Sequence, residues 1–141
     1  MGNCTFCDIL AEKQPVSPVY QDEICAVIMD IHPVNSGHVL VIPKQHAASL
    51  AELDENIGGH LFAIGQRVAA ALRRSGIHCE GINFFLADGE SAGQDVFHVH
   101  LHVFPRYEGD GFGLRFGPHY YKRPSREDLD AVAKKIRLSF V

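Results

Sequence analysis

The chain has 141 residues, of which 46% are hydrophobic and 21% charged, and its formal net charge is −4. This length fits one domain with a sizeable core, and the acidic balance argues against general binding to nucleic acid or to an anionic membrane. The N-terminal segment lacks the features of a signal peptide, and no apolar stretch is long enough to span a membrane. We therefore expect a cytoplasmic protein, in a compartment where disulfides are uncommon.

The first half of the chain predicts strands followed by one long helix. Short apolar runs bounded by turn residues predict strands over residues 17–21, 24–29 and 38–42. A loop rich in Pro, Asn, Ser and Gly separates the second strand from the third. Apolar residues at helical spacing predict a helix over 54–75, and Gly76 provides its C-terminal cap.

The second half predicts two more strands and a second helix. One strand covers residues 81–86, and the alternation of residues 98–103 predicts another, which Pro105 ends. A glycine-rich loop over 108–118 follows, and Ser125, with an acidic side chain three residues later, begins a C-terminal helix. The order of elements predicts the α+β class, with a five-stranded antiparallel sheet, one long helix and a C-terminal helix.

One short stretch carries three histidines at alternate positions, His98, His100 and His102. Successive side chains of a strand point to opposite faces, so the imidazoles share one face and the intervening apolar residues share the other. Burying three imidazoles costs free energy unless they are used. The row fits a nucleophile that attacks phosphorus, a set of catalytic metal ligands, or a hydrogen-bonded structural cluster. A turn with Gly93 and Gln94, suited to holding phosphate, precedes the row and favours the nucleophile.

These features resemble the histidine triad (HIT) superfamily of nucleotidyl hydrolases and transferases. The matching segments read DIHP, GHVLVIPK, AGQ, HVHLHV and PR, at residues 30–33, 37–44, 92–94, 98–103 and 105–106. The resemblance implies the HIT fold, with a single HIT domain over residues 1–141 that has its core at 4–107 and a C-terminal extension at 108–141. It also implies a homodimer joined through the long helix and strands.

The resemblance assigns unequal roles to the histidines. It implies that His100 attacks the α-phosphorus and forms a nucleotidyl-histidine, and that His102 lies beside the scissile bridging atom. His98 and the upstream His38 would orient the nucleophile and complete its polar shell. A neutral imidazole nucleophile keeps one nitrogen free while a hydrogen bond fixes the other, which agrees with these roles.

The resemblance also implies a nucleotide-binding cleft, in which Asp30 matches the acid that binds the ribose hydroxyls. Further matches surround the phosphates or line the base pocket, and they are Gly93, Gln94, Asp95, Phe6, Ile28 and Met29. The apolar members of this set fit a core equally well. Two positions depart from the family pattern: Ala87 stands where Asn or Gln is common, and Asp95 where Ser or Thr is common. These departures leave open an altered leaving-group preference or a loss of turnover.

The cysteines indicate a second site. Cys4 and Cys7 form a C-x-x-C pair, which alone fits either redox or structural chemistry. The chain resembles the HIT branch in which this pair binds zinc with two histidines, which by position are His46 and His98. Two thiolates and two imidazoles suit a closed, tetrahedral, structural zinc site. His98 would then serve both the zinc site and the triad.

The expected activity is hydrolysis of a nucleoside 5′-phosphate derivative of a purine nucleotide through a covalent nucleotidyl-histidine. A dinucleoside polyphosphate, such as a diadenosine polyphosphate, is the first candidate substrate, and a nucleoside phosphoramidate is the second. Two alternatives stay open. One is a zinc-dependent hydrolase that uses the triad histidines as ligands, and the other is a nucleotide-binding module with weak or no turnover.

Overall fold

The computed structural model describes residues 4–140 of the chain. Within this range the chain forms two compact units, one ending at Asp110 and the other beginning at Gly111. None of the helices in the described range is both long enough and apolar enough to cross a membrane. Besides three α-helices there are two single-turn 3-10 helices, at Leu50–Glu52 and Glu90–Ala92.

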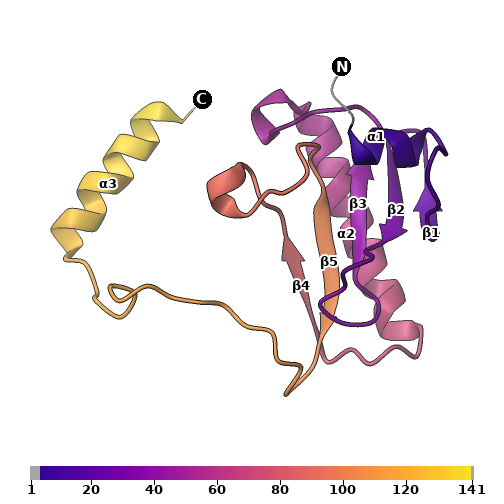
Figure 1. The fold of residues 1–141 in the computed structure, drawn as a ribbon. Coiled ribbons are helices and arrows are strands. Elements are labelled where there is room, and N and C mark those ends of the chain that lie inside the picture. The colour runs from indigo at the N-terminus through magenta and orange to yellow at the C-terminus, as the bar shows by residue number, and fades with distance from the viewer. Residues whose placement is uncertain (1–3, 141) are drawn as a thin grey trace. The chain divides into compact units, whose positions relative to one another are not determined.

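A five-stranded antiparallel sheet forms the centre of the first unit, as the sequence predicts (Figure 1). Its strands are β1 (Pro18–Gln21), β2 (Cys25–Met29), β3 (Val39–Pro43), β4 (Gly81–Phe85) and β5 (Leu101–Arg106). They lie side by side in the order β1-β2-β3-β5-β4. Strand β5, which begins within the histidine row, is therefore an interior strand, between β3 and β4.

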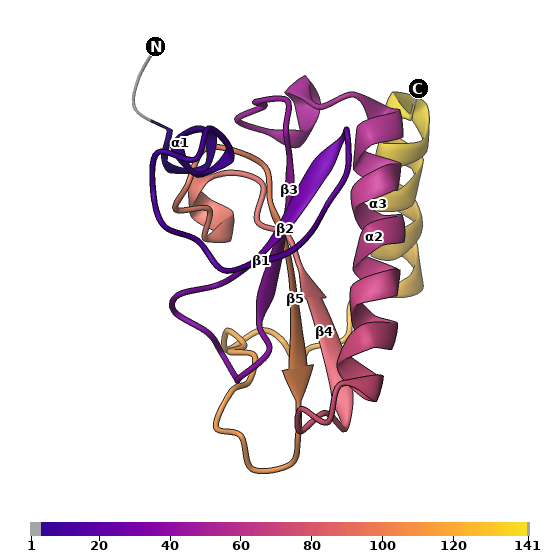
Figure 2. The same ribbon diagram turned by 90° about the vertical axis from the view of Figure 1, so that its right-hand side faces the viewer.

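The long helix α2 (Glu55–Arg74) covers one face of this sheet (Figure 2). The Asp54 side chain caps its first turn by accepting a hydrogen bond from the Asn56 amide. An apolar stripe of α2 packs into the main core, formed by Leu61, Ile64, Val68 and Leu72. A Cβ atom at Gly65 would lie 2.9 Å from the Phe84 ring, so glycine lets the helix approach the sheet closely there.

The opposite face carries a short helix that the sequence did not predict, α1 (Thr5–Leu10) (Figure 2). Its first turn is capped by the Cys4 thiol, which accepts from the Cys7 amide. Phe6 is buried with Ile28, Leu40 and Ile42 in a second apolar cluster. With one turn and a half, α1 has no stability of its own and depends on this packing.

The strand with the histidines differs from its predicted bounds, because β5 begins at Leu101 and runs through Pro105 to Arg106. The alternation of faces is nonetheless confirmed: Val99, Leu101 and Val103 belong to the core under α2. Pro105 is tolerated because the pairing of β5 with β3 already ends at Val103, so its missing N–H removes no hydrogen bond to β3.

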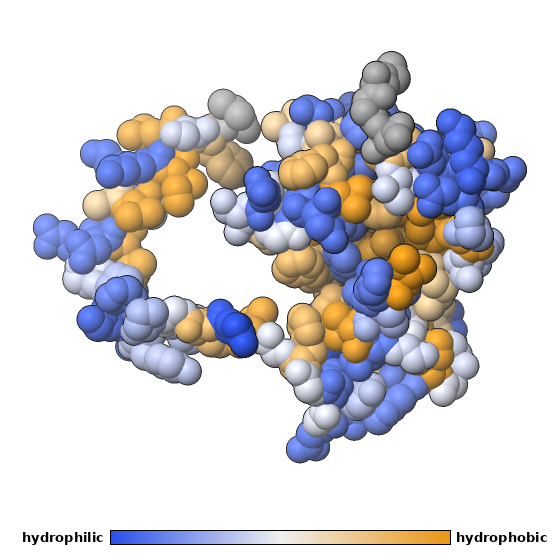
Figure 3. Space-filling view, viewed as in Figure 1, coloured by the Kyte–Doolittle hydropathy of each residue, from blue (hydrophilic) through white to orange (hydrophobic). Residues whose placement is uncertain are grey.

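The second unit contains helix α3 (Arg126–Ser139). As predicted, Ser125 is its N-cap, and the hydroxyl accepts from the Asp128 amide. Leu129, Val132 and Ile136 follow helical spacing and are 41–60% exposed. Figure 3 shows hydrophobic surface along one side of this helix.

Candidate active site

His100 is held by its own backbone neighbourhood. Its Nδ1 lies 2.7 Å from the carbonyl oxygen of His98. A carbonyl only accepts, so Nδ1 carries the proton and donates, and Nε2 keeps its lone pair. The ring is buried, and Phe6 packs edge-on against it at a centroid distance of 4.9 Å. This arrangement provides a fixed, neutral imidazole with one nucleophilic nitrogen.

His102 belongs to a directed chain of hydrogen bonds. The Val34 amide donates to Nδ1 of His38 at 2.9 Å, so the proton of the His38 ring is on Nε2. That Nε2 donates to Nδ1 of His102 at 2.8 Å. Nε2 of His102 therefore bears a proton. Burial, reinforced by the neighbouring His100 and His38, lowers the pKa of His102 to about 4, so the ring is a neutral donor near pH 7.

Asp30 lies at the end of β2 beside this pair of imidazoles. Its Oδ2 is 3.4 Å from Nε2 of His38 and 3.7 Å from Nδ1 of His102. Its Oδ1 accepts the amide of His32 at 2.8 Å, which fixes the carboxylate in the loop after the strand. The negative charge counteracts, but does not overcome, the burial that lowers the pKa of His38 and His102.

A cleft of about 270 Å³ opens onto these groups. His100 and His102 line it, together with residues of α1, β2 and the loop after β2. Five of the residues expected to contact a nucleotide also line it, and these are Asp30, Asp95, Phe6, Ile28 and Met29. The structure thus brings the predicted nucleophile, the acid expected at the ribose and the apolar residues into one hollow.

Gln94 and Gly93, which were expected to surround the phosphates, do not line this cleft. The Gln94 side chain is buried; its Oε1 accepts from the Gly89 amide, and its Nε2 donates to the carbonyls of Ala48 and Val96. Gly93 adopts a left-handed conformation, with φ of +93°, at the end of the 3-10 turn. Gln94 thereby fixes the turn that leads into the histidine row, and the sequence does not reveal these backbone partners.

Four ligand atoms cluster where α1 meets the histidine row. Nδ1 of His98 lies 3.4 Å from Sγ of Cys4 and 3.6 Å from Sγ of Cys7. Nδ1 of His46 lies 3.4 Å from Sγ of Cys7 and 3.2 Å from Nδ1 of His98. In tetrahedral zinc sites, ordinary bond lengths separate sulfur from nitrogen by roughly 3.5 Å and nitrogen from nitrogen by roughly 3.3 Å. The spacing therefore fits a zinc ion.

The chemistry of the donors agrees with this spacing. Nε2 of His98 donates to the carbonyl of Pro43 at 2.8 Å, which leaves Nδ1 unprotonated toward the cluster. Burial lowers the pKa of His98 and so favours this neutral form. Burial and the adjacent Cys4 thiol raise the pKa of Cys7, because two thiolates this close need a cation between them.

His98 consequently serves two sites with two different groups. Its ring faces the cysteines, whereas its backbone carbonyl holds His100. The sequence predicts that His98 serves both the zinc site and the triad. It does not predict that His98 contacts His100 through its backbone carbonyl. A side-chain pattern contains no signal for such a contact.

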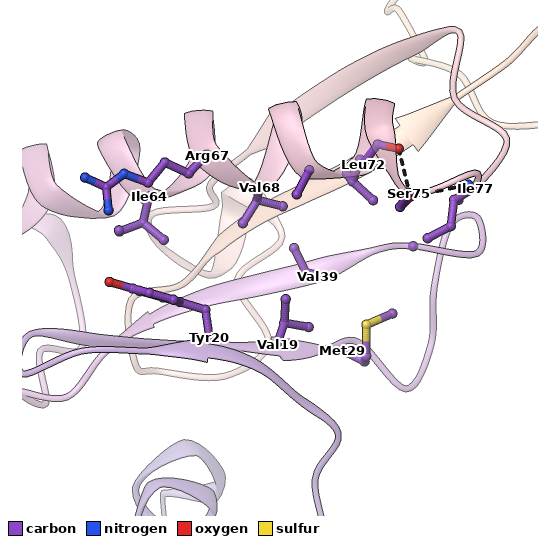
Figure 4. A pocket seen from close by; sticks show the side chains of 12 residues that line it. Val19, Tyr20, Met29, Val39, Ile64, Arg67, Val68, Leu72, Ser75 and Ile77 are labelled. Atoms are coloured by element: carbon purple, nitrogen blue, oxygen red, sulfur yellow. Dashed lines mark hydrogen bonds between the residues drawn. The ribbon is translucent and has the colours of Figure 1, made fainter.

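A separate apolar cavity of about 330 Å³ lies between α2 and the strands β1 to β3 (Figure 4). Its lining includes Val19 and Met29 from the sheet, Val68 and Leu72 from α2, and one charged side chain, Arg67. It contains no imidazole, thiol or carboxylate. The reactive groups of the triad therefore belong to the other cleft.

Comparison with known proteins identifies the family of the chain. A model of the HIT domain family matches residues 11–109. The chain is 38% identical over 141 residues to Protein hit of Bacillus subtilis, covering 97% of each. It is also 32% identical over 109 residues to an adenylylsulfatase of Arabidopsis thaliana, covering 77% of this chain and 55% of that protein.

Solved structures show the same fold. A crystal structure of a HIT family member from Bacillus subtilis has a TM-score of 0.87 at 37% identity, and covers 99% of this chain and 98% of that one. A zinc-bound histidine triad family protein from Mycobacterium smegmatis has a TM-score of 0.76 at 38% identity, covering 97% of both chains.

Proposed function

The chain belongs to the HIT domain family, and from this premise we propose that it hydrolyses nucleoside 5′-phosphate derivatives of a purine nucleotide through a covalent intermediate on His100. One observation carries the proposal: Nδ1 of His100 donates to the carbonyl of His98, so Nε2 is an oriented nucleophile beside the cleft. The family includes an adenylylsulfatase, which supports turnover on adenylyl compounds.

The first half-reaction forms the intermediate. The lone pair on Nε2 of His100 forms a bond to the α-phosphorus, and the bond from phosphorus to the leaving atom breaks. The leaving atom keeps the bonding electron pair and takes up a proton. The Nε2 proton of His102 is available to a phosphate oxygen, where charge develops in the transition state.

The second half-reaction releases the nucleotide. A water oxygen bonds to phosphorus and loses one proton, which balances the proton taken up by the leaving group. The bond between phosphorus and Nε2 breaks, and its electron pair returns to His100. The products are a nucleoside monophosphate and the protonated leaving group.

The shape and polarity of the cleft indicate how the nucleoside binds. Asp30 is positioned to accept hydrogen bonds from the two ribose hydroxyls. Phe6 and Ile28 offer apolar surface to the base, whereas the Met29 side chain packs with the main core on the α2 side of the sheet. Ile28 and Phe6 also belong to the second apolar cluster, so the base would bind against a preformed wall.

We propose that zinc binds at Cys4, Cys7, His46 and His98, which would hold it with no ligand position left open. A closed site of this kind supplies structural cross-linking. His98, fixed by its bond to Pro43, keeps its carbonyl in place for the His100 ring.

The alternative of a zinc-dependent hydrolase needs the three triad nitrogens around one ion. Among residues 4–140, no cluster of ligand atoms contains all three of these histidines. His98 joins the cysteines, and His102 joins His38 and Asp30. This arrangement favours the covalent mechanism.

The alternative of a binding module without turnover arose from Ala87 and Asp95. Ala87 is 8% exposed and does not itself line the cleft. Asp95 does line the cleft, but its carboxylate takes no part in the hydrogen bond that fixes His100. The nucleophile is therefore oriented despite both departures, which supports turnover.

Replacing the nucleophile tests the proposal. We expect His100→Ala to lower kcat by at least about 10³-fold, as the loss of a nucleophile does elsewhere, while the affinity for AMP stays within about threefold. Steady-state release of monophosphate and calorimetric titration measure the two quantities. His78→Ala, at an exposed histidine outside the cleft, is the matched control. Retention of a tenth of the activity in His100→Ala would refute the nucleophile assignment.

A further inference from the structure

A second hollow adjoins the catalytic cleft, and Asp95 stands where they meet. Thr5, Asp95 and Val96 line both. The second hollow has a volume of about 420 Å³, and Phe97 forms part of its wall. A group bonded to a phosphorus atom at His100 can therefore extend past Asp95 into a space that the nucleoside does not need.

The charge around this junction has one sign. Among the described residues, neither hollow is lined by a lysine or an arginine. Asp95 is exposed, and within residues 4–140 no group donates a hydrogen bond to its carboxylate. The second hollow is also lined by Cys4 and His46, where the charge of a zinc ion would be balanced by the two thiolates of its site. A phosphate chain or a sulfate placed here would therefore meet the Asp95 carboxylate and no lysine or arginine to offset it.

The aromatic ring at the junction adds a second preference. The Phe97 side chain, two residues after Asp95, is 52% exposed in the wall of the second hollow. An exposed wall is ordinarily polar, so an aromatic side chain there is available to contact a ligand. The face of an aromatic ring attracts organic cations, and a carboxylate attracts an ammonium group. Asp95 and Phe97 together offer what a positively charged amine needs.

The orientation of a bound substrate follows from the cleft itself. Asp30 and the apolar residues of β2 take the nucleoside, and His100 marks the position of phosphorus. The second hollow, which joins the cleft at Asp95, gives the leaving group a space of its own. Asp95 is also close enough to the reacting groups to influence His102. The negative charge of its carboxylate favours the protonated form of that ring and so opposes the lowering of its pKa.

We propose that the second hollow is a leaving-group subsite in which Asp95 and Phe97 select an amine that carries a positive charge over an anionic leaving group. This inference rests on the proposed hydrolysis at His100. The bond that breaks is the P–N bond; its electron pair stays on the leaving nitrogen, which takes up one proton and departs as an amine. Asp95 takes no part in the bond changes and acts on specificity alone.

Two phosphoramidates of equal length separate charge from reactivity. In one, AMP is joined through its phosphorus to 1,3-diaminopropane, which leaves a pendant ammonium group; in the other it is joined to β-alanine, which leaves a pendant carboxylate. We expect the wild-type protein to prefer the cationic compound in kcat/KM by at least about tenfold. Asp95→Asn should bring the ratio near one, and Phe97→Leu should reduce it several-fold.

The control is Glu23→Gln, which removes the same charge from an exposed position outside both hollows and should leave the ratio unchanged. Equal kcat/KM for the two compounds in the wild type, or an unchanged ratio in Asp95→Asn, would overturn the subsite. A third result would also overturn the subsite: Mg²⁺ reverses the preference of the wild type but not that of Asp95→Asn. The Asp95 carboxylate would then bind a metal cation instead of the leaving group.

Failure of the proposed function is a separate outcome. It appears as the absence of monophosphate release from either compound. In that case, calorimetry measures the affinity of the protein for the cationic and for the anionic compound, and the two affinities are compared in place of kcat/KM. Tighter binding of the cationic compound, lost in Asp95→Asn, supports the subsite, and equal affinities overturn it.

Discussion

His102 shows how burial and hydrogen bonding together set the state of a single side chain. The ring is 19% exposed, and burial together with the neighbouring imidazoles of His100 and His38 outweighs the Asp30 carboxylate at 3.7 Å. Burial lowers its pKa from an ordinary value of 6.5 to about 4. The His38 ring donates to Nδ1 and so also opposes protonation there. The folded protein therefore keeps a neutral donor at the phosphate position.

This shift predicts a loss of stability in acid. Between pH 6.5 and pH 4 the unfolded chain binds a proton at His102 and the folded chain does not. The free energy of unfolding must then fall as the pH falls, by about 2 kcal/mol at pH 5 and about 3 kcal/mol once the folded ring is protonated. Urea denaturation of the wild type and of His102→Asn, from pH 8 to pH 5, measures it. Asn offers an acceptor to His38 but does not titrate. Between pH 8 and pH 5 the free energy of unfolding of His102→Asn should therefore fall by about 2 kcal/mol less than that of the wild type. Parallel curves would contradict the prediction.

Much of the residue-scale assignment is visible in the sequence. The alternation of His98, His100 and His102 predicts that they share a face, and it also places Val99 and Leu101 in the core. The tautomers are not predictable in this way. They depend on the carbonyls of Pro43 and His98 and on the Val34 amide, which are backbone groups that any residue carries.

Helix α1 acquires its stability from what it contacts. It is six residues long, its N-cap is a thiol, and Phe6 is its one fully buried side chain. A segment this short is too brief for periodicity to indicate a helix, so the sequence predicts the C-x-x-C pair at its start but not the helix itself. The strands β1 to β4 lie within one or two residues of their predicted bounds, because each has its own apolar run between turn residues.

Loss of the metal site should loosen α1 without abolishing the chemistry. We expect the wild type to hold about one zinc ion per chain and Cys7→Ser to hold almost none, with a lower Tm and faster amide exchange in residues 5–10. Activity should fall by about tenfold, since the His98 carbonyl is less firmly placed, and should not fall to the level of His100→Ala.

Elemental analysis, hydrogen exchange and initial rates test this expectation, with Cys79→Ser outside the cluster as the control. An activity in Cys7→Ser as low as that of His100→Ala would favour catalytic zinc instead. A full zinc content in Cys7→Ser would refute the ligand set.

At the scale of the molecule, the two edges of the sheet differ. The β1 edge begins with Pro18, and its pairing with β2 is irregular between Pro18 and Tyr20, which discourages pairing with another strand. The β4 edge is a regular five-residue strand that contains no proline or charged residue. Beside it the exposed Phe62 of α2 packs on Phe84 of β4 at a centroid distance of 5.3 Å.

A regular edge strand beside an exposed aromatic side chain favours association of two copies, so we propose a homodimer in which β4 and α2 face their counterparts across a two-fold axis. Multi-angle light scattering should give the wild type a molar mass of twice the chain mass of 15.6 kDa. Phe62→Asp should shift it to the chain mass, because a carboxylate buried against its own symmetry mate repels. Gln21→Asp, at an exposed position on β1 outside the apolar cavity, should stay dimeric. A dimeric Phe62→Asp, or a monomeric Gln21→Asp, would place the interface elsewhere, since the two substitutions add the same charge, one beside the β4 edge and one on the β1 edge.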